Sequence, residues 1–416
     1  MLKISKIYVL LGIFALVQSS LIAQNSTNSP YSRYGYGVIA DRSFGAGRAM
    51  GGIGYGLRSS QQINPMNPAS YSSMDSLTFL FDVGATLQLS LLNDETNSHR
   101  NLNGNLDYFA MQFPISHNMA MSAGILPSSH VGYSIKAVSE TGDVSHLDNF
   151  SGKGGLNEVY VGWSIDIWKK RLSFGANVGY MFGNIDHNSE VAYSTGQQIS
   201  SLYTKKKVDL RHWKYDLGMQ YTHPLSKTER MIFGLAYSPK IKFSSVSYDV
   251  VSNNLSIIKA DTVRNKGFDF PNTLGFGASY VKDYSWILAA DLSLQDWANA
   301  HFFGENNQFK NRFKFAVGGE YIPNNFTRAY LSRVRYRVGA NFSNSYLQIK
   351  DMGGYSEYGV CLGVGFPMLD NRSFINASVE YVRIMPESKV LINEHYFRFT
   401  LSFTFNEFWF MKQKMD

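Results

Sequence analysis

Strict alternation of apolar and polar residues is the dominant pattern along this chain, and it is clearest near the C-terminus. Phe397, Phe399, Leu401, Phe403 and Phe405 alternate there with arginine, threonine and serine residues. Successive side chains of an extended strand point to opposite faces, so this segment predicts a strand with one apolar and one polar face. Four of its five apolar residues are phenylalanine, and such a strand suits a position between lipid and a polar lumen.

The alternation recurs along the chain and predicts fourteen strands, an even number as closed bacterial barrels have. The predicted strands cover residues 77–91, 105–115, 118–137, 156–168, 171–182, 205–221, 231–250, 271–281, 285–297, 312–321, 330–346, 355–367, 373–382 and 396–405. Their connections are alternately long and short, which is the asymmetry of outer-membrane barrels and predicts that both termini lie on the periplasmic side. Unpaired backbone groups are costly in hydrocarbon, so the first and last strands are expected to pair.

The segment before the first strand has a different character. Lys3 and Lys6 precede an apolar run over residues 7–17, and Ala23 offers a small residue for cleavage, which predicts a signal peptide over residues 1–23. The run is too short for a membrane anchor helix, which needs about 20 apolar residues. Residues 24–76 are rich in glycine and proline, so we expect a compact plug there rather than a long helix or strand. The barrel is predicted over residues 77–406, with a short periplasmic tail over residues 407–416.

Composition narrows the class of protein. Charged residues make up 17% of the chain, below the roughly 25% of soluble domains, and aromatic residues make up 15%. After residue 23 there is no apolar run of about 18 residues, which excludes helical membrane spans. Cys361 is the only cysteine, and the basic residues are scattered along the chain, so neither a disulfide framework nor a nucleic-acid partner is expected. An all-β transmembrane antiparallel barrel in the outer membrane of a Gram-negative cell fits these features.

Catalytic and cofactor chemistry has little support in the sequence. The nine histidines are dispersed without metal-ligand spacing, and no Gly-x-Ser-x-Gly elbow occurs. The glycine-rich stretch over residues 45–51 lacks the preceding strand and the spacing of a dinucleotide-binding loop. We therefore expect a protein that is not an enzyme and that holds neither a cofactor nor a metal.

Two groups of basic residues are candidate contact sites. Arg333, Arg335 and Arg337 alternate with apolar residues, which places all three on the luminal face, since a cation facing lipid would cost roughly 2 to 4 kcal/mol. There they would pair with acidic residues such as Asp82 or Glu320, or attract an anionic group such as a fatty-acid carboxylate. Near the start of the sixth strand, the cations at residues 205–207 and 211 would contact lipopolysaccharide phosphates or form a solvated rim.

The chain resembles the FadL/TodX family of outer-membrane channels over nearly its whole mature length. The motifs that carry the resemblance are short. One begins at Gly47 and ends with Gly51 and Gly52, and the other is the triplet Asn67, Pro68 and Ala69. The family resemblance implies that these residues belong to a plug, or hatch, that ends before the first strand. The aromatic and basic C-terminal end, residues 405–414, resembles the Bacteroidota branch of the family.

The resemblance also implies a function. Family channels take up hydrophobic compounds such as long-chain fatty acids and release them through a wall opening at a kink in the third strand, where Gly124 and Pro127 are the candidates here. The same branch contains accessory barrels of larger outer-membrane complexes, for protein insertion or type IX secretion. Our first hypothesis is therefore a channel for hydrophobic compounds, whose plug around Asn67, Pro68 and Ala69 closes the periplasmic end, and the alternative is a non-enzymatic accessory subunit. A continuous apolar groove from mouth to plug would favour transport. A filled, salt-bridged lumen would favour an accessory subunit.

Overall fold

The computed structural model describes residues 26–93, 98–141, 144–168, 170–193, 201–283, 285–305, 308–349, 352–369 and 371–409. The predicted signal peptide and residues 410–416 of the predicted tail lie outside this part of the chain. Within it, no helix has the length and apolar character needed to cross a membrane.

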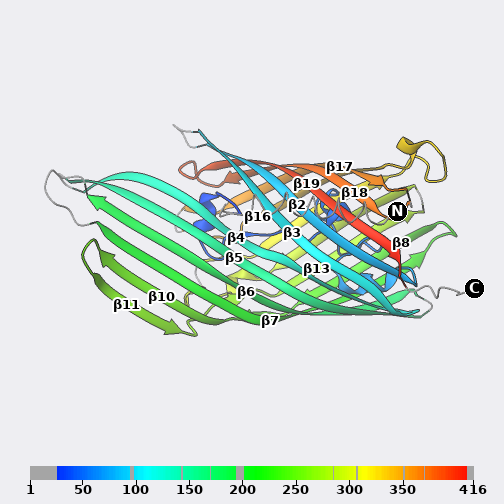
Figure 1. Cartoon of the computed structure of the whole chain (residues 1–416), viewed down its shortest axis with the longest axis horizontal. Helices are drawn as coiled ribbons and strands as arrows, with labels where there is room; N and C mark the ends of the chain where they lie inside the picture. The colour runs from blue at the N-terminus through cyan, green and yellow to red at the C-terminus, as the bar shows by residue number, and fades with distance from the viewer. Residues whose placement is uncertain are drawn as a thin grey trace, which may run out of the picture.

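Fourteen antiparallel strands form a closed barrel wall, as the alternation predicts (Figure 1). They are β2 (Thr78–Asn93), β3 (Ser98–Ser116), β4 (Met119–Thr141), β5 (Val144–Ile167), β6 (Leu172–Tyr193), β7 (Leu202–Pro224), β8 (Glu229–Ser238), β13 (Thr273–Lys282), β14 (Trp286–Gln295), β15 (Arg312–Tyr321), β16 (Arg335–Asn344), β17 (Tyr355–Pro367), β18 (Phe374–Pro386) and β19 (Asn393–Phe408). Strand β19 closes the wall against β2, with Asn393 opposite Asn93 and Phe408 opposite Thr78. Closure leaves the first and last strands without open edges in the bilayer.

The two faces of the closing strand are inverted relative to a soluble protein. Phe399 and Leu401 are about half exposed on the outside, whereas Thr400, Ser402 and Thr404 are buried. An apolar outer face and a polar inner face are what a barrel in lipid requires. The chain therefore forms a transmembrane β-barrel, and the sequence alternation along β19 sets which face each of its residues occupies.

One side of the wall is far taller than the other. Strands β4 to β7 contain 22 to 24 residues each, whereas β13 to β16 contain 10 each. Since a strand rises about 3.3 Å per residue, the tall strands exceed the short ones by roughly 40 Å along the strand. The connections expected over residues 138–155 and 183–204 are thus largely strand, because outside lipid a paired strand needs no apolar face.

The strand predicted over residues 231–250 is broken. After β8 ends at Ser238, Pro239 interrupts the ladder, and β9 (Ile241–Lys242) turns to pair with β12 (Asp269–Phe270). The chain then resumes as β10 (Ser244–Asn253), which pairs with the N-terminal half of β7. A hairpin leads to β11 (Ile257–Arg264), which pairs with β10.

Inside the barrel lies the plug, here residues 26–76. Its regular elements are all short: the 3-10 helices η1 (Pro30–Arg33) and η2 (Pro68–Ser73), the strand β1 (Val38–Ile39) and the helix α2 (Gly45–Arg48). Two more 3-10 helices, η3 (Trp297–Asn299) and η4 (Tyr330–Ser332), lie in wall connections. Glycine and proline are abundant in the plug, which explains why its helices and strands are all short.

Candidate functional site: the plugged lumen

Glycines on the inner face of the wall mark the course of the plug. A Cβ atom on Gly234 of β8 would lie 1.8 Å from the carbonyl oxygen of Tyr55, and one on Gly318 of β15 would lie 2.2 Å from that of Met50. The same close approach to plug backbone or side chains occurs at Gly162, Gly175, Gly218, Gly275, Gly277, Gly339 and Gly363. We call these nine wall glycines the glycine track. They lie on β5, β6, β7, β8, β13, β15, β16 and β17, so the plug packs directly against much of the circumference.

This packing restricts the lumen severely. Distances below 3.0 Å from a Cβ atom require a neighbour to move, and at Gly234 and Gly318 that neighbour is plug backbone. Only glycine lets two backbones approach so closely. The plug is thus seated as the core of the barrel rather than suspended across a pore.

A buried group of four charges joins the plug to β5 and β7. Arg42 of the plug lies 3.2 Å from Glu158 and 2.9 Å from Asp216, and Lys214 lies 2.9 Å from Glu158 and 3.1 Å from Asp216. The Glu158 and Asp216 side chains are 1% and 4% exposed. Burial opposes the charge of Arg42, but the two carboxylates raise its pKa above the usual range. Two cations thus balance two anions, of which the carboxylates and Lys214 are almost fully buried while the Arg42 side chain is 25% exposed.

Further ion pairs join the plug to other parts of the wall. Arg58 of the plug lies 2.6 Å from Asp166 of β5, and Asp41 lies 2.7 Å from Lys314 of β15. Burial opposes the charge of Asp41, yet the cations of Lys314 and Arg48 hold its pKa well below its usual range. With the four-charge group, these pairs anchor the plug on both sides of the barrel.

Asp291 of β14 holds the plug through its backbone. Its carboxylate accepts hydrogen bonds from the backbone N–H groups of Gly54, Tyr55 and Gly56, at 2.5, 2.8 and 3.4 Å. Three donors converging on one ionised acceptor form stronger hydrogen bonds than neutral pairs do. Asp291 is 5% exposed, so little water competes for these donors.

Replacing Asp291 by asparagine is expected to loosen this part of the plug. The asparagine side chain has the same shape as aspartate but no charge. Its NH2 group would face backbone N–H donors at one of the positions where the carboxylate oxygens accepted hydrogen bonds. We therefore expect the free energy of unfolding to fall by about 1 to 3 kcal/mol. The measurement is the denaturant midpoint of barrel unfolding in detergent, together with protease cleavage within residues 49–66. Asp296→Asn, just beyond the end of the same strand, serves as control, since that carboxylate accepts hydrogen bonds from the side-chain amide of Asn299, at 2.9 and 2.8 Å, in a wall connection. Equal effects of the two substitutions would contradict the role of Asp291.

The predicted plug residues all lie at contacts with the wall. Gly51 and Gly52 adopt φ of +85° and +81°, which favours glycine, and the backbone N–H of Gly51 donates to the sulfur of Cys361 at 2.9 Å. Asn67 caps η2 by accepting from the N–H of Ala69 at 3.2 Å, and donates to the carbonyl of Tyr55 at 2.9 Å. Pro68 and Ala69 lie against Gly175 of the track.

The predicted kink residues lie in β4, beside a break in the wall. Gly124 still pairs with Ala110 of β3, but the pairing of these strands ends at Ile125, and a bulge follows Pro127. Above this level the plug takes the place of β3: Val38 and Ile39 of β1 pair with His130 and Ser129 of β4. Plug hydrogen bonds also reach β3, from Asn28 to Asn103 and from Asn105 to the carbonyl of Ser26. The gap between β3 and β4 is therefore occupied by residues 26–40.

Of the three expected luminal arginines, two occupy the lumen. Arg337 lies 2.7 Å from Glu320 and donates to Asn376, and Arg335 lies 3.6 Å from Glu320. Arg333 does not join them, because the strand begins only at Arg335 and the preceding turn, η4, directs the Arg333 guanidinium to the side chain of Asn371. One carboxylate faces two guanidinium groups here, so the trio keeps a net charge of +1, and Arg335 also donates to the side-chain oxygen of Gln61 in the plug.

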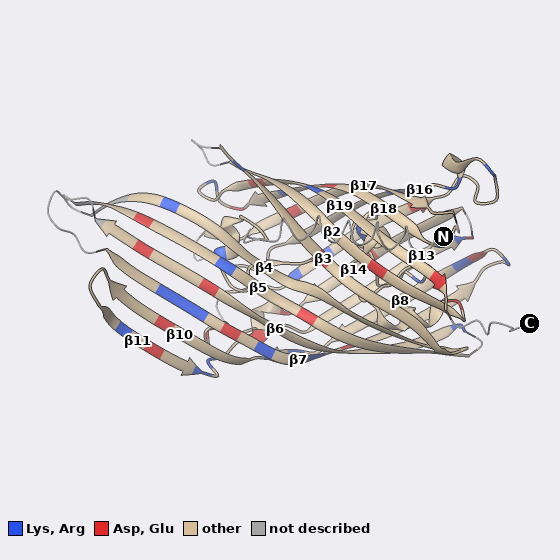
Figure 2. Ribbon diagram, viewed as in Figure 1, with Lys and Arg blue, Asp and Glu red and all other residues tan. Residues whose placement is uncertain are grey.

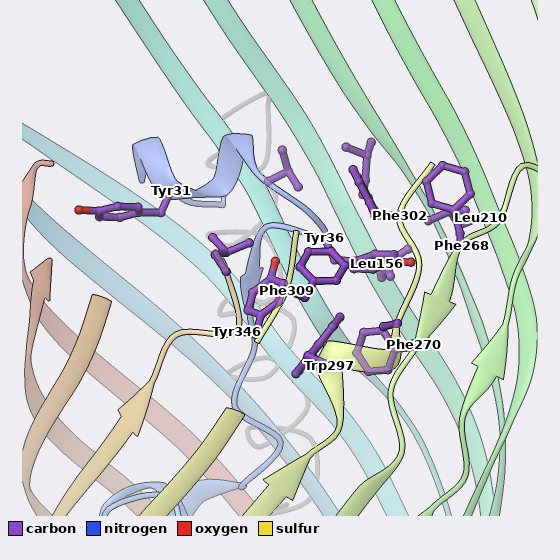
Figure 3. Packing of buried hydrophobic residues seen from close by; sticks show 14 of the residues in the cluster. Tyr31, Tyr36, Leu156, Leu210, Phe268, Phe270, Trp297, Phe302, Phe309 and Tyr346 are labelled. Atoms are coloured by element: carbon purple, nitrogen blue, oxygen red, sulfur yellow. The ribbon is translucent and has the colours of Figure 1, made fainter. Parts of the chain in front are cut away.

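Aromatic side chains fill the outer half of the lumen (Figure 3). Tyr36 of the plug packs against Phe302 and Trp297, with ring centroids 5.1 and 5.7 Å apart, and Trp297 packs on Tyr346 at 4.4 Å. The outer aromatic cluster comprises Tyr36, Phe243, Phe268, Phe270, Trp297, Phe302, Phe309 and Tyr346, all less than 10% exposed. Apolar surface in the lumen is thus packed against itself.

Below this cluster a cavity lies between the plug and the wall, and both polar and apolar side chains line it. It has a volume of about 170 Å³, and charged side chains line it, among them Arg48, Asp107, Lys314, Glu380 and Arg398. Pockets for drug-sized ligands hold about 300 to 1,000 Å³ and are mostly apolar. Within the described residues, no cluster of three or more His, Cys, Asp or Glu side chains is placed to hold a metal ion.

The comparison with protein families decides the membership of the chain. The family model described as BamG matches residues 1–416. The chain belongs to the BamG family. No curated protein matches it in sequence.

Solved structures similar to this BamG-family barrel are FadL- and TodX-type channels, in agreement with the resemblance seen in the sequence. The toluene transporter TbuX of Ralstonia pickettii is 15% identical, with a TM-score of 0.58 over 88% of this chain and 98% of that one. The toluene transporter TodX of P. putida is 14% identical, with a TM-score of 0.57 over 90% and 100%. A FadL homologue of Pseudomonas aeruginosa is 13% identical, with a TM-score of 0.56 over 88% and 99%. At this identity the likeness establishes the fold alone.

Sequence reasoning did not identify the glycine track or the four-charge group. The signal for the track was present, because glycines recur at positions that the alternation assigns to the inner face, such as Gly318 between Val317 and Gly319. Their meaning depends on which plug residue lies opposite, and only the tertiary structure shows that.

Proposed function

We propose that this barrel is a non-enzymatic accessory subunit of a larger outer-membrane complex. The observation that carries the proposal is the filled lumen: the plug packs directly on the glycine track, and buried ion pairs join it to several strands. The cavity beside the plug, about 170 Å³, is smaller than a pocket for a drug-sized ligand, and charged side chains form part of its lining. A barrel whose interior is occupied in this way acts through its outer surface, on other proteins and on lipid.

Family membership supports this proposal independently. The sequence resemblance raised two kinds of complex, for protein insertion and for type IX secretion. Of these two complexes, the match of the BamG family model over the whole chain favours the protein-insertion complex. The fold itself does not choose, since one fold hosts many functions.

A second candidate function, transport of hydrophobic compounds, rests on the break between β3 and β4. The wall strands separate above Phe109 and Ile125, beside Gly124 and Pro127, and the TodX-type fold is that of hydrocarbon channels. In the present structure residues 26–40 fill this break with backbone pairing and hydrogen bonds. Transport would require these residues to leave the break and the outer aromatic cluster to open.

The test of the proposal is gentle detergent extraction of the tagged full-length protein from its native outer membrane. Mass spectrometry would then identify both the co-purifying proteins and the bound small molecules. We expect stoichiometric recovery of other outer-membrane subunits and no apolar compound above the level found with a control barrel of similar size. Recovery of a lone barrel that carries fatty acids or similar compounds would contradict the proposal and support transport.

A further inference from the structure

The connection between β15 and β16, residues 322–334, differs from the other turns at its end of the barrel. It is longer than the turns over residues 225–228 and 283–285, and it contains η4. In Figure 1 it is the gold loop at the rim of the barrel, at the end where the C-terminus lies. Short turns mark the periplasmic end of outer-membrane barrels, so this connection leaves the wall on the periplasmic side of the membrane.

A row of aromatic side chains on the outer face of the wall marks the membrane surface beside this connection. Trp286 of β14 lies opposite Tyr321 of β15, which lies opposite Tyr336 of β16. These three residues are 44, 38 and 40% exposed, whereas Arg335 and Arg337, on the other face of β16, pair with Glu320 in the lumen. Tryptophan and tyrosine gather at membrane–water interfaces, so the row lies at the level of the lipid headgroups.

The connection is held at this level on the lipid side of the wall. The hydroxyl of Tyr336 donates a hydrogen bond to the carbonyl oxygen of Leu331, at 3.3 Å. The hydroxyl of Tyr330 donates to the carbonyl oxygen of Pro367 in β17, at 3.1 Å. Because the Tyr336 side chain points outward, Leu331 lies beside the outer face of the barrel and not over the lumen.

Large apolar and aromatic side chains of the connection are exposed. Phe326, Leu331 and Tyr330 are 78, 69 and 45% exposed. Grouped exposed apolar side chains of this kind mark interaction sites. At the headgroup level, lipid would cover them in continuation of the apolar outer face, to which Val338 of β16, 55% exposed, belongs. The bilayer that surrounds the barrel is therefore the surface that lies next to these side chains.

The backbone of the connection is suited to a position partly out of water. The N–H of Asn324 donates to the carbonyl of Ser332 at 2.8 Å, and the N–H of Ser332 donates to the carbonyl of Ala329 at 3.2 Å. The N–H of Phe326 donates to the side-chain oxygen of Asn324 at 2.9 Å. Unsatisfied backbone groups are costly where water is scarce, so these hydrogen bonds lower the cost of entering the interface.

The charge of the connection matches an anionic membrane surface. It contains Arg328 and Arg333 and no acidic residue, and Figure 2 shows basic positions in blue on this loop. Arg333 donates to the side chain of Asn371 at 2.7 Å, whereas Arg328 is exposed. Cations beside an exposed apolar face favour binding to anionic lipids. An anionic phospholipid offers acyl chains to the apolar side chains and a phosphate to Arg328.

We propose that residues 322–334 anchor the barrel in the periplasmic leaflet of its membrane. Leu331 and Phe326 enter the boundary between headgroups and acyl chains, and Arg328 contacts the phosphate of an anionic phospholipid. This anchor is independent of the proposed function, because a lone barrel and a subunit of a complex would both be surrounded by lipid on this side.

The experiment measures the depth of residue 331 in a membrane of known composition. Leu331→Cys carries a nitroxide label, and the folded barrel with its plug is reconstituted in vesicles of phosphatidylethanolamine and phosphatidylglycerol. Collisions of the nitroxide with a water-soluble nickel chelate, present on both sides of the membrane, report its exposure to water. Lys227→Cys, an exposed position in the turn between β7 and β8, is the control in water, and Val338→Cys is the control in lipid.

We expect the nickel accessibility of the label at residue 331 to be about fivefold lower than at residue 227 and close to that at residue 338. Accessibility equal to that at residue 227 would overturn the proposal, because the apolar side chains would then be open to a partner protein and not covered by lipid. Cys361 is 1% exposed, and unmodified protein taken through the labelling measures its background. Heat-modifiable migration in SDS shows that every variant barrel is folded.

The phosphate contact of Arg328 has its own measurement. When phosphatidylcholine replaces phosphatidylglycerol, we expect the nickel accessibility of the label at residue 331 to rise about twofold, because the electrostatic attraction to the membrane surface is lost. The Arg328→Gln variant should give the higher value in both lipid mixtures. A difference between the two mixtures that persists in Arg328→Gln would contradict the contact between Arg328 and the phosphate.

Discussion

Replacing Gly234 by valine is expected to unseat the plug while the barrel wall remains closed. The valine Cβ would lie 1.8 Å from the carbonyl oxygen and 2.5 Å from the carbonyl carbon of Tyr55. The rigid wall strand pairs on both sides, with β7 and β13, so the plug is the part that must move. Its displacement also breaks the hydrogen bond from Asn67 to the Tyr55 carbonyl. Overpacking of this kind costs about 1 to 3 kcal/mol or more.

Two measurements check this expectation. Limited proteolysis of folded protein in detergent should cleave within residues 49–66 at least tenfold faster than in the unmodified protein. Planar-bilayer recordings should show ion conductance in the variant only, because the plug fills the lumen of the unmodified protein. Gly104→Val is the matched control, since a Cβ at Gly104 meets only the side chain of Leu87, at 3.4 Å. Conductance in the unmodified protein, or its absence in a Gly234→Val barrel with a cleaved plug, would contradict a plug that closes the lumen.

If Gly234→Val fails to fold, Gly318→Ala offers a milder test. Its Cβ would lie 2.2 Å from the carbonyl oxygen of Met50, at a point of the glycine track three strands away from Gly234. A folded Gly318→Ala barrel with an unchanged plug would show that the plug adapts to the wall. Faster cleavage near Met50 would show that the close approach is needed.

Replacing Lys214 by methionine is expected to cause the second large effect, a loss of about 3 to 5 kcal/mol in stability. Methionine keeps the length of the side chain but removes the cation that lies 2.9 Å from Glu158 and 3.1 Å from Asp216. Arg42 alone then faces two buried carboxylates, and one negative charge is left uncompensated. Removal of one partner from a buried ion pair is more costly than replacement of the whole pair.

The measurement is the equilibrium unfolding midpoint in denaturant for barrels refolded in detergent micelles. Lys207→Met on the same strand is the control, because Lys207 and Asp209 form a 3.4 Å pair with side chains 36 and 42% exposed. An exposed pair contributes about 1 kcal/mol or less. The double change of Lys214 to methionine and Glu158 to glutamine leaves Arg42 opposite Asp216, at 2.9 Å, and should recover part of the loss. Equal midpoints for Lys214→Met and Lys207→Met would show that the four-charge group does not stabilise the plugged barrel.

The two predictions separate the candidate functions as well. An accessory subunit needs its plug seated at all times, so both substitutions should reduce the recovery of partner subunits together with stability. A transporter needs a plug that moves, so moderate loosening would leave partner recovery unaffected and raise uptake. The filled wall break between β3 and β4 makes the first pattern the expected one.

The alternation of residues determined the class of fold before any tertiary information. Period-two alternation with phenylalanine at positions such as Phe399 follows from lipid on one side and polar groups on the other, and this physical demand acts residue by residue. For the same reason the number of wall strands, and the face that side chains such as Arg335 and Arg337 occupy, were predictable. The ends of β5 and β6 could not be predicted. Beyond the bilayer the outer face of a strand becomes polar, so strand and loop have similar sequences there.

The contents of the lumen were decided by the tertiary structure. Arg335 and Arg337 were placeable by alternation, but Arg333 was not, since the strand start depends on the turn η4. Likewise, nothing in the local sequence distinguishes Gly234 and Gly318 from any other glycine in a strand. Glu158 and Lys214, which form an ion pair, are 56 residues apart in the chain. Contacts between distant segments have no local pattern. The sequence by itself therefore determined a closed antiparallel transmembrane barrel, and only the packing of residues 26–76 against the wall decided what occupies its lumen.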